Sequence, residues 1–99
     1  MSYRTKLFDE YLSEQLQNPD MAREFLLSSM HGPEGLDLIE ALKRTISCMG
    51  IKEFASASKI HRNSISRMLS QAEIPKVETL NKYLAVFKLK SKIIVIEDS

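Results

Sequence analysis

One stretch, residues 54–69 with the sequence FASASKIHRNSISRML, constrains the fold most, because it holds two short helical patterns only a few residues apart. The apolar residues that recur at helical spacing on its inner side are Phe54, Ala55, Ile65, Met68 and Leu69. Ile60 falls between the two patterns, where an apolar side chain can plug a tight turn. The stretch therefore predicts two helices that pack on one core and are joined by a short turn.

The outer side of the second predicted helix is polar and basic. The side chains left facing outward are His61, Arg62, Asn63, Ser64, Ser66 and Arg67. Arginine matches the acceptor edge of guanine and asparagine the edge of adenine, and a recognition helix presents such residues from its N-terminal half. A merely solvated surface would accept glutamate as readily, yet no acid occurs between Lys59 and Gln71. The pattern indicates a helix-turn-helix that reads double-stranded DNA.

The predicted DNA-binding residues divide by their position in this motif. The side chains expected to reach base edges are Arg62, Asn63 and Arg67. Those expected to contact phosphates are Ser66 and Ser70 on the same helix and Lys52, Lys59 and Lys76 near helix ends. Ser64 also faces outward, and the sequence leaves open whether it contacts a base or a phosphate.

The distribution of charge agrees with this prediction, although the net charge is only +1. Residues 1–49 hold five Lys/Arg and eight Asp/Glu, whereas residues 50–99 hold nine and five. From Lys59 to Lys92 there are eight basic and two acidic residues, a net charge of +6. Such a segment is typical of phosphate contact, and a solvated basic surface is the simpler alternative.

Periodicity and capping residues predict the remaining elements. The expected helices span residues 7–16, 19–30, 36–49, 51–58, 62–70 and 77–87. Thr5 or Asp9 is expected to cap the first helix, Asn18 to cap the second, and Gly50 to end the third. The run KIIVIE at residues 92–97 is β-branched and bounded by charges, which predicts a short C-terminal strand.

Ninety-nine residues are enough for one domain with a small core. We expect a single domain over residues 1–99, made of an N-terminal helical extension (1–34), a helix-turn-helix core (35–90) and a strand with a tail (91–99). The fold class is mostly α. The longest apolar runs are too short to cross a membrane and the start lacks a signal-peptide pattern, so we expect a cytoplasmic protein.

Several residues between positions 50 and 89 carry a family resemblance. They are Phe54-Ala55, Ile60-His61, Ile65-Ser66-Arg67, Pro75 and Thr79-Leu80. They resemble the run LAxxxGxSxxxISR, a proline loop and a further helix in the phage-repressor-type (Cro/cI, XRE) helix-turn-helix family. The upstream segment FDEYLSEQLQNPDMAREFLLSSM is similar to that of the probable addiction-module antidote proteins, which are HigA-like antitoxins. Together these resemblances imply a five- to six-helix lambda-repressor-like DNA-binding domain.

The resemblance also implies a function, and at two positions this sequence differs from the usual family pattern. It implies a repressor that controls its own operon and neutralises a RelE/HigB-like mRNA-cleaving toxin. Lys59 stands where the family usually has glycine, so a left-handed backbone there would cost about 1 kcal/mol more than with glycine. His61 stands at the usual serine or threonine cap; because histidine caps poorly, we expect its ring to face a phosphate or base.

Three other functions are alternatives to an antitoxin that represses its own operon. An enzyme has little support, because His31 lies in a glycine-proline loop, the lone Cys48 looks buried, and no metal-ligand spacing or phosphate loop is present. We therefore expect no catalysis, no metal and no cofactor. A pure protein-interaction module and a free-standing phage or plasmid regulator without a toxin remain open as alternatives to the antitoxin.

Two protein partners are predicted. A lone strand leaves its backbone unpaired, so residues 93–96 of two copies are expected to pair across a dyad, packed near Tyr83 and Phe87, in a homodimer that reads a palindromic operator. A basic toxin is expected on the N-terminal half. Its encounter would be steered by Asp9, Glu10, Glu14, Asp20 and Glu24, with apolar contact from Tyr3, Leu7 and Tyr11.

Overall fold

The computed structural model describes residues 3–33, 35–71 and 75–90, with side chains from residue 9 onward. The elements are α1 (Tyr3–Leu16), α2 (Pro19–His31), α3 (Leu38–Met49), α4 (Ile51–Ser58), α5 (Arg62–Ser70), α6 (Val77–Leu84) and a 3₁₀ turn η1 (Ala85–Phe87). The mostly helical prediction is confirmed, and no strand occurs within the described ranges. The strand predicted at residues 92–97 lies outside them.

The first two helices meet at a capped junction. Asn18 is the N-cap of α2, where its side-chain Oδ1 accepts hydrogen bonds from the backbone N–H groups of Asp20 (2.9 Å) and Met21 (3.4 Å). Pro19 occupies the first helical position, where its fixed φ is favourable and no N–H is needed. The cap predicted for α2 is therefore confirmed. The caps predicted for the first helix are wrong, since α1 already begins at Tyr3 and Thr5 and Asp9 lie inside it.

The third helix begins later than its apolar stripe suggests. Asp37 is its N-cap, and the side-chain Oδ1 accepts from the N–H of Glu40 at 2.8 Å. Leu36 therefore precedes the helix, although it packs against the core. At the other end Gly50 adopts φ +107°, a backbone conformation that side-chain-bearing residues rarely adopt, and it joins α3 directly to α4. This conformation confirms the C-cap predicted at Gly50.

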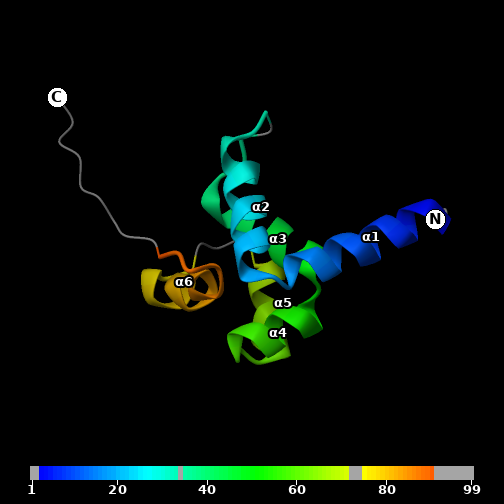
Figure 1. Ribbon diagram of the computed structural model, residues 1–99. Helices are drawn as coiled ribbons and strands as arrows, with labels where there is room; N and C mark the ends of the chain where they lie inside the picture. The colour runs from blue at the N-terminus through cyan, green and yellow to red at the C-terminus, as the bar shows by residue number, and fades with distance from the viewer. Residues whose placement is uncertain (1–2, 34, 72–74, 91–99) are drawn as a thin grey trace.

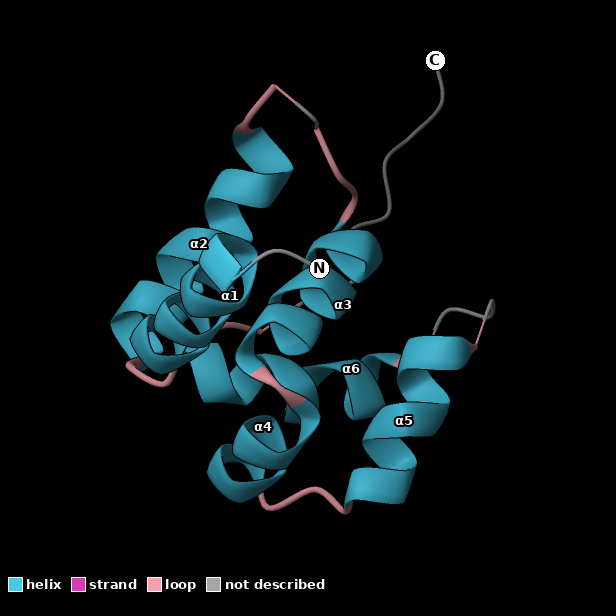
Figure 2. Cartoon of the chain, turned by 90° about the vertical axis from the view of Figure 1, so that its right-hand side faces the viewer, coloured by secondary structure: helices cyan, strands magenta, loops and turns pink. Residues whose placement is uncertain are grey.

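The turn between α4 and α5 consists of residues 59–61. Lys59 has φ 64° and ψ 18°, so the left-handed backbone foreseen at this position is present without glycine. The hydroxyl oxygen of Ser58 accepts a hydrogen bond from the N–H of Ile60 at 3.1 Å, which supports the turn from within. Figure 2 shows α5 at the side of the molecule, joined to α4 by this turn at the bottom of the view.

An aromatic cluster fixes the two helices to the rest of the fold. Phe54 of α4 is fully buried and its ring stacks on Tyr83 of α6 (5.8 Å between centroids) and on Phe87 of η1 (6.0 Å). The Tyr83 hydroxyl donates to the backbone carbonyl of Ser64 in α5 at 3.3 Å. Burial raises the pKa of Tyr83 above its ordinary value. The cluster therefore sets the position of α5 relative to α4 and α6.

α1 extends away from the other helices, as Figure 1 shows. Its C-terminal end is anchored, because Leu16 is buried and the Ser13 hydroxyl donates to the carbonyl of Met49 at the end of α3. Tyr11 is 61% exposed. Among the described residues, no helix is both long and apolar enough to cross a membrane.

Candidate nucleic-acid interface

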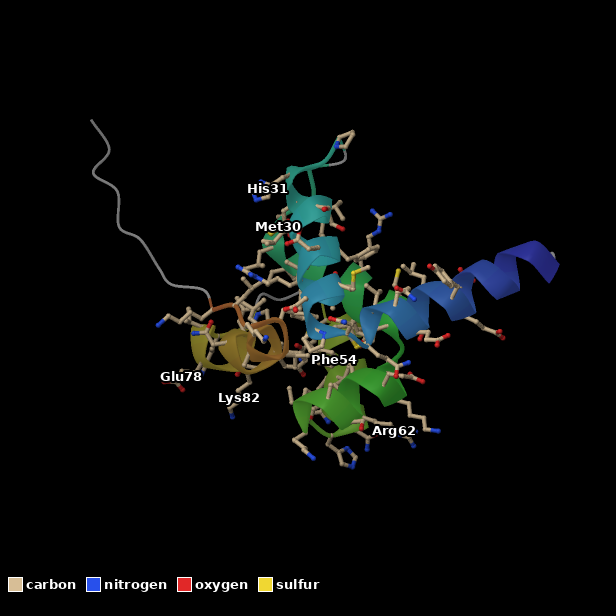
Figure 3. All side chains as sticks on the ribbon, viewed as in Figure 1. Met30, His31, Phe54, Arg62, Glu78 and Lys82 are labelled. Atoms are coloured by element: carbon tan, nitrogen blue, oxygen red, sulfur yellow. The ribbon has the colours of Figure 1, made fainter. Side chains whose placement is uncertain are left out.

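α5 buries one side and exposes the other. Ile65 and Met68 enter the core, where both side chains are buried. The ten predicted DNA-binding residues are all exposed, namely Lys52, Lys59, His61, Arg62, Asn63, Ser64, Ser66, Arg67, Ser70 and Lys76. Arg62 points away from the core at the lower side of Figure 3. The structure therefore leaves every one of these side chains accessible to an external partner.

His61 caps α5, contrary to the prediction that its ring would serve only an external group. Its Nδ1 accepts a hydrogen bond from the backbone N–H of Asn63 at 3.1 Å, with extended backbone at the cap. When Nδ1 accepts, the neutral ring carries its proton on Nε2. Because the side chain is exposed, this N–H is available to a phosphate oxygen. One ring can thus fix the end of the helix and donate outward.

Replacing His61 by alanine should lower the free energy of unfolding by about 0.5–1 kcal/mol, because the exposed Asn63 N–H loses its cap. His61→Ser keeps a capping oxygen and should retain the wild-type stability. Urea denaturation of both variants measures the difference. Equal losses of stability in the alanine and serine variants would show that the cap contributes nothing.

A hydrogen bond from α3 stabilises the C-terminal end of α5. Lys43 donates from Nζ to the backbone carbonyl of Gln71, the C-cap residue, at 2.6 Å. Sequence reasoning missed this contact because the two residues are 28 positions apart. At the same end the Ser70 hydroxyl donates to the carbonyl of Arg67 at 3.1 Å, so its predicted phosphate contact requires the hydroxyl to rotate.

The basic side chains of α5 make no ion pair with another described residue. An exposed ion pair joins Lys88 and Asp20 at 3.7 Å, away from α5 in the sequence. No described carboxylate pairs with Arg62, Arg67 or Lys76. Cations that lack an internal partner favour an external anion, and nucleic-acid phosphates are the anions that such a surface suits.

The residues considered for catalysis are not brought together. Cys48 is partly exposed, which corrects the expectation that it is buried. Burial nevertheless raises the pKa of its thiol; nearby Arg44 lowers it and Asp9 raises it further. His31 is exposed at the C-terminal end of α2. No group of three potential metal-ligating side chains occurs in residues 3–33, 35–71 and 75–90.

One protein-family model matches nearly the whole chain. A family model described as "Probable addiction module antidote protein" matches residues 4–95, which cover α2 to α6 and all of α1 except Tyr3. The chain belongs to this family. No curated protein and no solved structure matches it.

Proposed function

We propose that this protein is a sequence-specific DNA-binding repressor in which α5 is the recognition helix of a helix-turn-helix of the phage-repressor (Cro/cI) type. The observation that carries the proposal is the exposed polar and basic face of α5, which has no acidic residue and makes no ion pair with another described residue. Its base-reading side chains are Arg62, Asn63 and Arg67. Hydrogen bonds and ring stacking in the turn and the aromatic cluster hold α5 in place, and a recognition helix held in this way can enter a major groove.

The proposal extends to neutralisation of a toxin. Membership of the antidote family supports an antitoxin that represses its own operon and binds a RelE/HigB-like mRNA-cleaving toxin. The acidic residues proposed to steer a basic partner, Asp9, Glu10, Glu14, Asp20 and Glu24, are all exposed. Tyr11 supplies an exposed aromatic surface beside them. The side chains of Tyr3 and Leu7 lie outside the described residues.

A homodimer is also proposed, in which two recognition helices reach half-sites about 34 Å apart on a palindromic operator. The predicted interface pairs residues 93–96 of two copies near Tyr83 and Phe87, and residues 93–96 lie outside the described ranges. Within the described residues, the rings of Tyr83 and Phe87 stack on Phe54.

Two measurements test the proposed function together. Fluorescence anisotropy should show tight binding to a duplex from the region upstream of the protein's own gene and weaker binding to a scrambled duplex. Co-expression with the product of an adjacent small gene should give a stable complex and relieve toxicity. DNA binding without such a complex would favour the free-standing regulator, and a complex without DNA binding would favour the pure interaction module.

A further inference from the structure

An open groove of about 570 Å³ lies beside the recognition helix, between the α4–α5 turn and α6. The residues that line its walls include Ser58, Lys59, Ile60, Ser64, Thr79 and Lys82. Tyr83 also lines the groove. Sequence reasoning did not single out the groove, because its two sides come from separate helical patterns that the fold brings together.

The walls of this groove are fixed. On one side, the Ser58 hydroxyl holds the turn through the N–H of Ile60. On the other side, the Tyr83 ring stacks on Phe54 and its hydroxyl is bound to the carbonyl of Ser64. A ligand therefore meets a preformed surface and does not have to order it, which lowers the entropic cost of binding.

Two cations flank the groove from opposite sides. Lys59 on the turn and Lys82 on α6 are both exposed, and neither makes a hydrogen bond or ion pair with another described residue. Lys82 points to the same lower side of Figure 3 as Arg62. Exposed hydroxyls of Ser64 and Thr79 lie in the same lining. Two ammonium groups with neighbouring hydroxyl donors suit a singly charged phosphodiester.

We propose that this groove binds a phosphate of the DNA backbone next to the bases that α5 reads, with Lys59 and Lys82 as the charged contacts. The inference rests on the proposed DNA-binding function and adds Lys82 and Thr79 to its interface. Ser64 belongs to both α5 and the groove, so a duplex seated on α5 reaches the groove without a break. The contact fixes register on the duplex and carries no base preference.

The test is the salt dependence of binding to a short mixed-sequence duplex, measured by fluorescence anisotropy between about 50 and 200 mM salt. Lys82→Gln should reduce the slope of log K against log[salt] by about 0.9, the value for one phosphate contact. Lys59→Asn removes the other charge, and asparagine tolerates the left-handed backbone at this position. The double variant, with both Lys59→Asn and Lys82→Gln, should reduce the slope by about twice as much as Lys82→Gln alone.

Lys90→Gln is the matched control, since Lys90 is also exposed and does not line the groove. It should leave the slope close to that of the wild type. If Lys82→Gln kept the wild-type slope, or if Lys90→Gln reduced the slope equally, the proposed phosphate site in the groove would be wrong. DNA binding by the wild-type protein would be unaffected by that result. Failure of the wild-type protein to bind any duplex at low salt would overturn the groove and the proposed function together.

Discussion

Replacing Arg67 by alanine should weaken binding to the upstream operator by about 1–3 kcal/mol and relax the preference for one base pair. The guanidinium of Arg67 is exposed on α5 and makes no ion pair with a described carboxylate. Its N–H groups can therefore donate to the acceptor atoms on the edge of a guanine. The measurement is the affinity for the operator duplex, for single-base variants of it and for a scrambled duplex.

Lys76→Ala is the contrasting variant, because Lys76 is exposed at the N-cap of α6 and is assigned to a phosphate. It should weaken operator and scrambled duplexes alike and lower the salt slope by about 0.9. If Arg67→Ala also weakened both duplexes equally, Arg67 would be a phosphate contact and the assignment of α5 as the base-reading helix would lose its main support.

Replacing Phe54 by alanine should lower the free energy of unfolding by about 3–5 kcal/mol, a large part of the stability of a small domain. The Phe54 ring is fully buried and joins α4 to α6 and η1 through its stacking on Tyr83 and Phe87. Its loss leaves a cavity where α4 meets α6 and η1. Urea denaturation followed by circular dichroism measures the effect.

Tyr11→Ala is the control for an aromatic deletion, because Tyr11 is 61% exposed on the extended α1. It should change stability by less than about 0.5 kcal/mol. Phe54→Leu refills part of the cavity and should recover a substantial part of the loss. A Phe54→Ala protein as stable as the Tyr11→Ala protein would contradict the role given to the aromatic cluster.

Local signals predicted the central helices well. The bounds expected for α4 and α5, 51–58 and 62–70, are those observed. Gly50 marks the start of α4, and the short turn at 59–61 marks the end of α4 and the start of α5. The start of α3 was misplaced because the apolar Leu36 continues the helical stripe, whereas the cap that begins the helix is Asp37. A cap decides a helix end more strongly than periodicity does.

The contacts that position the candidate site were not visible in the sequence. The Tyr83–Ser64 and Lys43–Gln71 hydrogen bonds join residues 19 and 28 positions apart, and periodicity within one helix carries no information about such pairs. His61 was misjudged for a different reason: imidazole is an uncommon cap, and only the ring geometry shows Nδ1 facing the Asn63 N–H. The outward residues were found because exposure on a single helix follows from its period.

Titration of the isotope-labelled protein with the operator duplex, followed through its backbone amide chemical shifts, tests the central claim most directly. We expect the largest changes at residues 59–67, in the turn and the N-terminal half of α5, and small changes in α1. Changes confined to α1 and α2, with α5 unaffected, would contradict the assignment of α5 as the DNA-reading helix.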